Sequence, residues 1–138
     1  MRPSFKINLM ASIYAGSTPK YFLKIKDSSG AQLDPENVAQ VLDVIIFIYN
    51  ASTGDIIAKF YLNTLPEGGD WSLMTVKTIT AGDKRVQFYL TSEQTEQAAG
   101  ANTVIQVNLH FADTDAPDNT KINIKRAKFH EIKPAKTV

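Results

Sequence analysis

The chain has 138 residues, 43% of them hydrophobic and 21% charged, and a formal net charge of +1. This length and composition fit one globular domain, and so small a net charge excludes a general attraction to nucleic acid or to anionic membranes. The sequence holds no cysteine, which excludes disulfides, thiolate nucleophiles and cysteine-ligated zinc. No apolar run reaches the length of a membrane span.

The amino-terminal stretch 5–14 alternates apolar and polar residues, which predicts a strand. Asn8 and Ser12 interrupt its apolar run, so we read it as a strand, able to act as an assembly arm, rather than as a cleaved signal peptide. A second strand is predicted over 20–26. Its inward residues are Tyr21, Leu23 and Ile25.

The most hydrophobic strand is predicted over 41–49. Its two faces carry Leu42, Val44, Ile46 and Ile48 on one side, and Asp43, Ile45, Phe47 and Tyr49 on the other. A sheet with one solvated face shows polar residues on that side, whereas this strand is apolar on both. Something must therefore cover the second face. The candidates are the amino-terminal strand, a loop over 64–72 that carries Trp71, or a partner protein.

A turn over 50–54 leads into a strand over 55–63. Matching apolar faces predicts the pairs Ile48–Ile56 and Ile46–Ala58. The same register continues the second apolar side of strand 41–49 onto its neighbour. The resulting patch comprises Ile45, Phe47, Ile57 and Tyr61. If the chain leaves this patch uncovered, it is an interface.

Further strands are predicted over 71–79 (irregular or at an edge), 85–90, 103–112 and 121–132. Thr91 and Gln94 form a capping box, which predicts a short helix near 92–99. A β-bulge at Lys125–Arg126 would explain a change of apolar parity within the last strand. Residues 133–138 form a tail. The pattern indicates an all-β protein, a sandwich of seven to eight strands forming one domain over 1–138.

The order of these parts has a recognisable pattern. The hairpin VIIFIYNASTGDIIAKFY precedes the strand-to-helix segment VQFYLTSEQTEQAAG, the strand TVIQVNLHFAD and the last strand KINIKRAKFHEI. Over residues 20–132 this resembles the immunoglobulin-like β-sandwich domains of tailed-bacteriophage structural proteins, such as the amino-terminal domains of baseplate upper proteins. The resemblance implies a non-enzymatic assembly role in the virion. We expect this domain to stand alone, without an attached fibre or receptor-binding domain, which leaves a head-decoration role open beside a tail role.

Two groups of residues are candidate metal ligands. The loop with Asp113, Asp115 and Asp118 offers oxygen ligands for Ca²⁺ but lacks the turn glycine and distal glutamate of an EF-hand; the alternative is a solvated turn. His110 and His130 are predicted on outward positions, where a zinc site would need a third ligand that the sequence does not indicate.

Charge is uneven along the chain. Residues 121–138 carry six Lys or Arg against one Glu, whereas residues 91–118 carry five Asp or Glu and no Lys or Arg. The basic strand, with Lys125, Arg126 and Lys128, can bind nucleic acid, protect a sheet edge, or pair with acidic residues of a neighbouring subunit. Without interleaved aromatic residues we expect no nucleic acid, and we place these three residues with the interface.

No nucleophile–base set or phosphate-binding loop stands out, so we expect no enzymatic activity and no cofactor. We expect a virion structural protein that binds other virion proteins or itself, as an auxiliary capsid, head-fibre or baseplate component. The alternative is a carbohydrate- or surface-binding module. Its exposed aromatic residues would be Trp71, Tyr14 and Tyr89.

Overall fold

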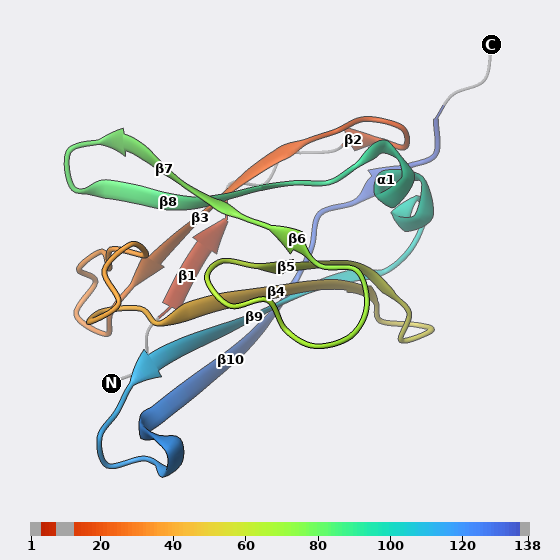
Figure 1. Ribbon diagram of the computed structural model, residues 1–138. Coiled ribbons are helices and arrows are strands. Elements are labelled where there is room, and N and C mark those ends of the chain that lie inside the picture. Colours follow the sequence, from red (N-terminus) through yellow and green to blue (C-terminus); the bar gives the residue numbers. More distant parts are fainter. Residues whose placement is uncertain (1–3, 8–12, 136–138) are drawn as a thin grey trace.

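The computed structural model describes residues 4–7 and 13–135 of the chain (Figure 1). Within these ranges the protein is mostly β, as the alternation predicts, and no helix is long and apolar enough to cross a membrane. The elements in chain order are β1 (Ser4–Ile7), β2 (Ile13–Tyr14), β3 (Lys20–Lys26), β4 (Asp43–Asn50), β5 (Ile56–Tyr61), β6 (Ser72–Leu73), β7 (Thr75–Thr80), β8 (Asp83–Tyr89), α1 (Ser92–Ala98), β9 (Thr103–Ala112), the 3₁₀ turn η1 (Pro117–Asn119), β10 (Thr120–Lys128) and β11 (Ile132–Lys133).

The strands form three sheets. A four-stranded sheet has the order β1-β3-β8-β7, a five-stranded sheet has the order β10-β9-β4-β5-β6, and β11 pairs with β2. The pairs β5–β6 and β11–β2 are parallel, and the other pairs are antiparallel. In Figure 1 the four-stranded sheet lies above the five-stranded one.

One hydrophobic cluster contains residues from both larger sheets. Tyr21, Leu23 and Ile25 of β3 are buried, as their alternation predicts. The rings of Phe60 in β5 and Phe88 in β8 lie 4.9 Å apart and so join the two sheets directly. Burial of these apolar side chains is the main stabilising contribution in a chain without disulfides.

The chain leaves β10 after Lys128 and turns into the core. Phe129 and His130 are buried, and His130 shares a hydrogen bond with the Tyr21 hydroxyl. Desolvation raises the pKa of that hydroxyl above its ordinary value. The prediction that His130 faces outward is therefore wrong. The predicted bulge is wrong as well, because β10 pairs with β9 without a register shift. Ile122 and Ile124 lie on one side of the regular strand, and Ala127, which pairs with buried Ile105, lies on the other.

The single strand predicted over 5–14 corresponds to two separate strands in the structure. β1 pairs with β3 in the four-stranded sheet, whereas β2 pairs with β11, and residues 8–12 lie outside the described residues. Alternation over 5–14 predicts extended backbone correctly, but it cannot indicate that the two ends join different sheets. The described part of the expected assembly arm pairs with its own chain.

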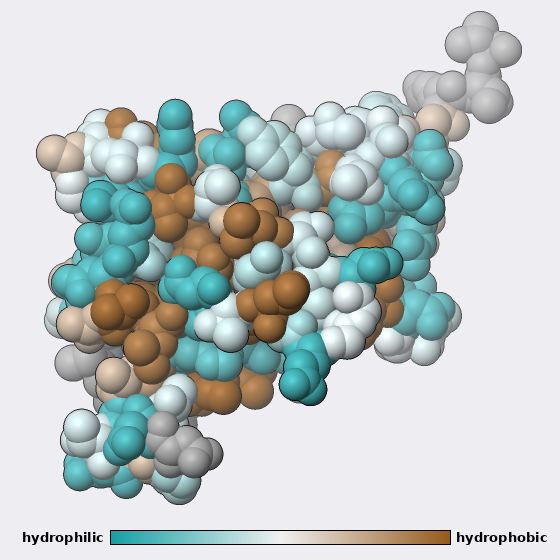
Figure 2. All heavy atoms as spheres, in the orientation of Figure 1, coloured by the Kyte–Doolittle hydropathy of each residue, from teal (hydrophilic) through white to brown (hydrophobic). Residues whose placement is uncertain are grey.

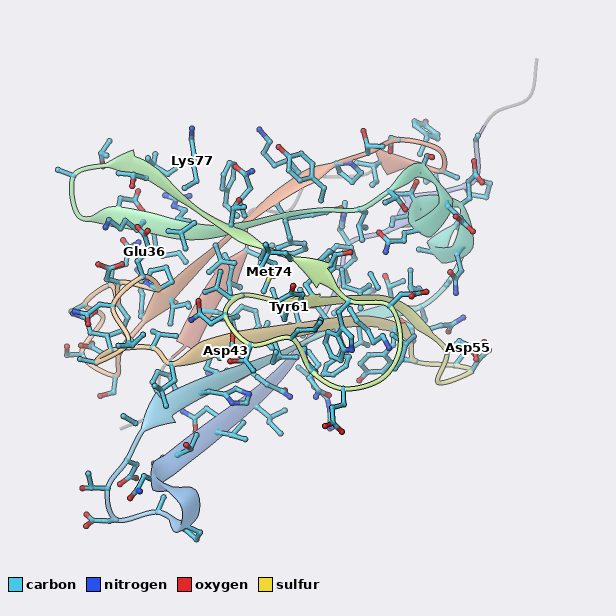
Figure 3. The ribbon with its side chains drawn as sticks, in the orientation of Figure 1. Glu36, Asp43, Asp55, Tyr61, Met74 and Lys77 are labelled. Atoms are coloured by element: carbon cyan, nitrogen blue, oxygen red, sulfur yellow. The ribbon has the colours of Figure 1, made fainter. Side chains whose placement is uncertain are left out.

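The predicted irregular strand 71–79 passes from one sheet to the other. β6 pairs with β5, and β7 pairs with β8, so the chain changes sheet at Met74. The Met74 side chain is buried, and its backbone N–H donates to the Tyr61 carbonyl at 2.8 Å. Figure 3 shows Met74 close to Tyr61, with Lys77 farther along the departing strand. The poor alternation reflects this change of partner.

The β4–β5 hairpin has the predicted parity but a different register. Ile48 pairs with Ala58 and Ile46 with Phe60, two residues from the predicted pairs, and the ladder is irregular between Ile48 and Tyr49. Ile57 is the extra residue at this irregularity, and it is buried in the core cluster. Ile57 therefore does not belong to the surface patch predicted from the sequence.

The helix prediction is confirmed. α1 follows Thr91, whose hydroxyl accepts from the Gln94 N–H at 3.1 Å, while the Gln94 side chain accepts from the Thr91 N–H at 2.9 Å. Thr95 is buried, and its hydroxyl donates to the Ser17 carbonyl and accepts from the Gly16 N–H. These bonds attach α1 to the segment that follows β2.

The start of β8 allows a test of pH-dependent stability. Asp83 accepts two hydrogen bonds from Arg85 and one from Gln32, all at 3.0 Å, and Lys24 lies 3.9 Å away. Hydrogen bonding by Arg85, then by Gln32, lowers the pKa of Asp83 to about 2. Because the folded pKa is below the unfolded value, the stabilisation is complete above about pH 4 and is lost as the pH falls toward 2.

We therefore expect Asp83→Asn to lower the urea midpoint at pH 7, with the deficit relative to wild type shrinking between about pH 4 and pH 2. Urea titrations followed by circular dichroism measure it. Asp55→Asn, in the exposed turn between β4 and β5, is the control and should behave as wild type. A deficit that stays constant down to pH 2 would contradict the assignment.

Candidate functional site

The face of the five-stranded sheet that points away from the core is the candidate site, and we call it the outer face. Register places Ile45, Asn108 and Ile124 side by side on it, followed by Phe47, Gln106 and Arg126. Tyr61 extends the first row through its pairing with Ile45. The structure thus brings together Ile45, Phe47, Tyr61 and Arg126 of the predicted interface, and register also places Lys128 on this side.

The chain itself covers the β4–β5 half of the outer face. Trp71, in the segment that joins β5 to β6, packs edge-on against Phe47 with ring centroids 5.4 Å apart. The Lys59 ammonium lies 5.0 Å from the Trp71 ring centroid, which is a cation–π contact. Ile45 is buried but does not belong to the core cluster. Of the covers proposed from the sequence, the 64–72 loop is therefore the one that lies over Phe47.

A glycine with positive φ and an indole hydrogen bond shape this loop. A Cβ atom at Gly69 would collide with the Lys59 ammonium, and Gly69 has a φ of +75°. The Trp71 indole N–H donates to the Gly68 carbonyl at 2.6 Å, which holds the ring within its own turn. The positive φ favours glycine at position 69, and a Cβ atom there would require the flexible Lys59 side chain to move.

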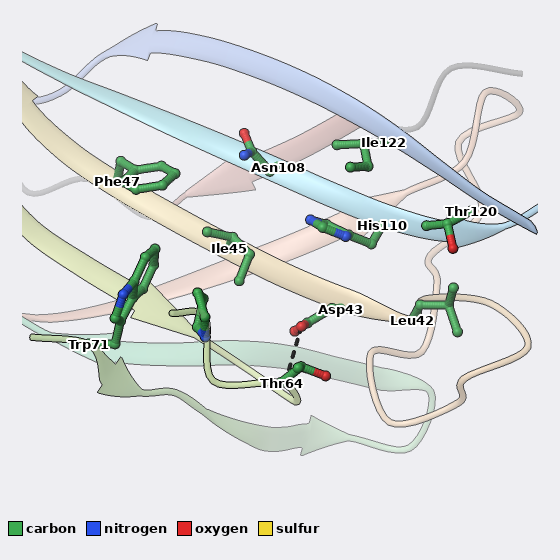
Figure 4. Close-up of a pocket in the computed structure, with 11 residues that line it drawn as sticks. Leu42, Asp43, Ile45, Phe47, Thr64, Trp71, Asn108, His110, Thr120 and Ile122 are labelled. Carbon is green, nitrogen blue, oxygen red and sulfur yellow. Dashed lines mark hydrogen bonds between the residues drawn. The ribbon is translucent and has the colours of Figure 1, made fainter. Parts of the chain in front are cut away.

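A buried carboxylate attaches the other end of the loop. Asp43 is 7% exposed, and one of its oxygens accepts from the backbone N–H groups of Val44 and Asn63 at 2.8 and 2.9 Å. Its second oxygen accepts from the Thr64 N–H at 3.1 Å, a bond drawn in Figure 4. The Asn63 side chain adds a bond to the Leu42 carbonyl. The sequence places Asp43 on this face but gives no indication of its anchoring role.

The β9–β10 half of the outer face is open. Ile122 and Ile124 are 50% and 55% exposed. Beside them is a mostly apolar hollow of about 620 Å³ between the loop and these strands. Figure 4 shows Trp71 and Thr64 on one side of Ile45, with Asn108, His110 and Ile122 on the other. The exposure of the two isoleucines was missed because a bulge was predicted in their strand.

The polar groups around the hollow differ in their partners. The Arg126 guanidinium donates to Gln106 at 2.8 Å, and the Gln106 amide donates to Asn108 at 3.0 Å. Among the described residues, neither the Asn108 amide nitrogen nor the His110 imidazole has a hydrogen-bond partner. These two groups are therefore available to an incoming molecule.

The basic residues of β10 lack carboxylate partners among the described residues, whose ion pairs involve Asp83 and Lys84 instead. Lys125 pairs in register with buried Val107, which places it on the side opposite the outer face. Arg126 and Lys128 remain as exposed cations on the outer-face side.

The candidate metal sites do not assemble among the described residues, in which no three acidic or histidine side chains could hold one ion. Asp113 accepts from the Asp115 N–H at 3.0 Å, as in a solvated turn, and the Asp118 side chain lies outside the described part. The aromatic residues proposed for carbohydrate binding are dispersed: Tyr14 is in β2, Tyr89 is in β8, and Trp71 is on the outer face.

No family model matches the chain, and the comparison with curated proteins gives no match. The chain is similar in structure to a DUF4785 family protein from Legionella pneumophila, with a TM-score of 0.47 and 10% identity. That alignment covers 96% of this chain and 29% of the Legionella protein. A similarity at this level carries no argument about function.

The anchoring of the loop by Asp43 can be tested with Asp43→Asn. The amide retains the volume but presents N–H groups to backbone donors, so we expect a loss of about 2 kcal/mol in the free energy of unfolding. Hydrogen exchange at Asn63 and Thr64 should accelerate, while exchange in β9 should not. Asp115→Asn, in an exposed turn, is the matched control. Unchanged exchange at 63–64 would show that Asp43 does not hold the loop.

Proposed function

We propose that the protein is a single immunoglobulin-like β-sandwich, residues 1–138, that serves as a non-enzymatic structural subunit of a tailed-bacteriophage virion. It binds other virion proteins, as an auxiliary capsid or head-decoration protein, a head-fibre protein or a baseplate component. The sequence resemblance over residues 20–132 supports the phage assignment. The outer face supports the binding role.

The strand order supports the immunoglobulin-like part of the proposal. In that fold, strands A, B, E and D form one sheet, and strands G, F, C and C′ form the other. The order β1-β3-β8-β7 corresponds to A-B-E-D, and β10-β9-β4-β5 corresponds to G-F-C-C′. The residues of both sheets in one core cluster fit two sheets packed face to face. α1 then lies in the E–F connection.

The open β9–β10 half of the outer face is the observation that carries the binding role. Ile122 and Ile124 project from a strand whose other side chains are largely polar, next to an apolar hollow. Exposed apolar patches beside polar rims mark interaction sites. Arg126 and Lys128 supply such a rim.

The chemistry around the hollow favours binding over catalysis. Asp43 and His110 are paired in register, but both Asp43 carboxylate oxygens accept backbone N–H groups and hold the loop. An acid–base pair needs a carboxylate directed at the imidazole or at the substrate. Asp43 therefore acts as an anchor in this proposal.

Quantitative mass spectrometry of density-purified particles from the source phage tests the role. We expect the protein at a fixed copy number relative to the major capsid protein. We also expect Ile122→Asp with Ile124→Asp to reduce incorporation at least tenfold, because two charges would be buried in the interface. Ile79→Asp, at an exposed apolar residue of β7 in the other sheet, is the control.

Absence from the particles would overturn the virion role. Glycan-array binding by the purified protein, together with that absence, would favour the carbohydrate-binding alternative. Each variant should have the circular dichroism spectrum and the urea midpoint of the wild type, so that reduced incorporation reflects the altered surface and not a loss of folding.

A further inference from the structure

We propose that the outer face binds a second copy of this chain, related by a two-fold axis parallel to the β4 and β9 strands. The inference rests on the proposed binding role of this face and names its partner. Three features of the face carry it. One half is raised by the loop and the other is open; the two halves differ in net charge; and the contacting groups of the two halves lie at the same positions along the strand direction.

The surface shape of the face is complementary to itself. The 64–71 loop covers the β4–β5 half, while the β9–β10 half is open beside the hollow. Thr64 and Pro66 line the hollow of their own chain, whereas Leu65 between them does not and is 61% exposed. The raised half of one copy can therefore cover the open half of another. Figure 2 shows hydrophobic residues reaching the surface over the loop, among hydrophilic ones.

The two halves differ in the sign of their net charge, since the loop half carries two carboxylates against the single cation Lys59. The loop carries Glu67 and Asp70, which are exposed and form no ion pair among the described residues. The β10 side carries Arg126 and Lys128, which likewise lack carboxylate partners there. A two-fold interface brings each patch against the other patch of its partner, so both pairs of charges are satisfied at once.

The loop and β10 also match in level along the strands. Trp71 contacts Phe47, and Phe47 is in register with Gln106 and Arg126, so Asp70 is at the level of Arg126. Thr64 bonds to Asp43, which is in register with His110 and Ile122.

A two-fold axis along the strands preserves these levels while it exchanges the sides of the face. Asp70 of one copy then meets Arg126 of the other, and Leu65 meets the hollow beside Ile122. Each of these contacts occurs twice in the dimer.

The area of the face sets the expected strength. Four long strands about 4.8 Å apart and about 27 Å in length present about 500 Å² per copy, or about 1,000 Å² for the pair. That area is near the lower limit for a specific interface, so we expect a reversible, concentration-dependent dimer rather than an obligate one.

Sedimentation velocity of the purified full chain over a concentration series tests the proposal. We expect the wild type to shift from monomer to dimer with concentration. Leu65→Asp should weaken the dimer about tenfold or more, because a charge would enter the partner's hollow. Ile79→Asp, at an exposed apolar residue of the other sheet, is the matched control and should dimerise as the wild type does.

A charge exchange tests the orientation. Asp70→Arg and Arg126→Glu should each weaken the dimer about tenfold through like-charge contacts, and the double variant should regain most of the wild-type affinity. A wild type that stays monomeric at every concentration would overturn the proposal, as would a double variant weaker than both single variants. A dimer that is absent from virions would overturn the proposed function alone, and a virion component that is monomeric would overturn this inference alone.

Discussion

The structure depends on the burial of β4 on both faces. Its inner side chains pack in the core that both sheets share, and its outer side chains would meet water without a second cover. The segment after β5 supplies that cover: Trp71 lies on Phe47, Gly69 passes close to Lys59, and Asp43 holds the start of the loop. Each contact has a limited value by itself, yet together they shield the outer side chains of β4 from water. The loop reaches only halfway across the sheet, and the surface left open is the face for which we propose a binding role.

The change of sheet at Met74 gives this arrangement its rigidity. β6 continues the five-stranded sheet beside β5, and two residues later the same segment pairs with β8 in the four-stranded sheet. The loop over the outer face is consequently held at one end by Asp43 and at the other by β6, from which the chain continues directly into β7 of the other sheet. A cover fixed at both ends keeps the hollow formed without a ligand, which lowers the ordering cost of binding.

Local patterns in the sequence predicted the elements well, and long-range pairings poorly. Alternation in β3 identified its inward residues, and the capping box located α1, because both signals arise within a few residues. The division of the amino-terminal strand between two sheets and the end of β10 depend on contacts between distant segments, and both differed from the prediction. The register of the β4–β5 hairpin also differed, by two residues. The same division holds at the site. Periodicity placed Ile45, Phe47 and Tyr61 on the outer face correctly. Ile57 was placed there wrongly, because the hairpin irregularity turns it into the core. The positions of His110 and Asn108 on this face follow from the pairing of β9 with β4.

The parallel pairing of β2 with β11 has a mechanical consequence. Because the two strands run in the same direction, opposite forces applied at Ile13 and at Lys133 would load this pair in shear. Its hydrogen bonds, including the 2.8 Å bond from the Ala15 N–H to the Lys133 carbonyl, then resist together instead of opening one after another. The hydrogen bonds of Thr95 to the segment after β2 pass part of that load to α1.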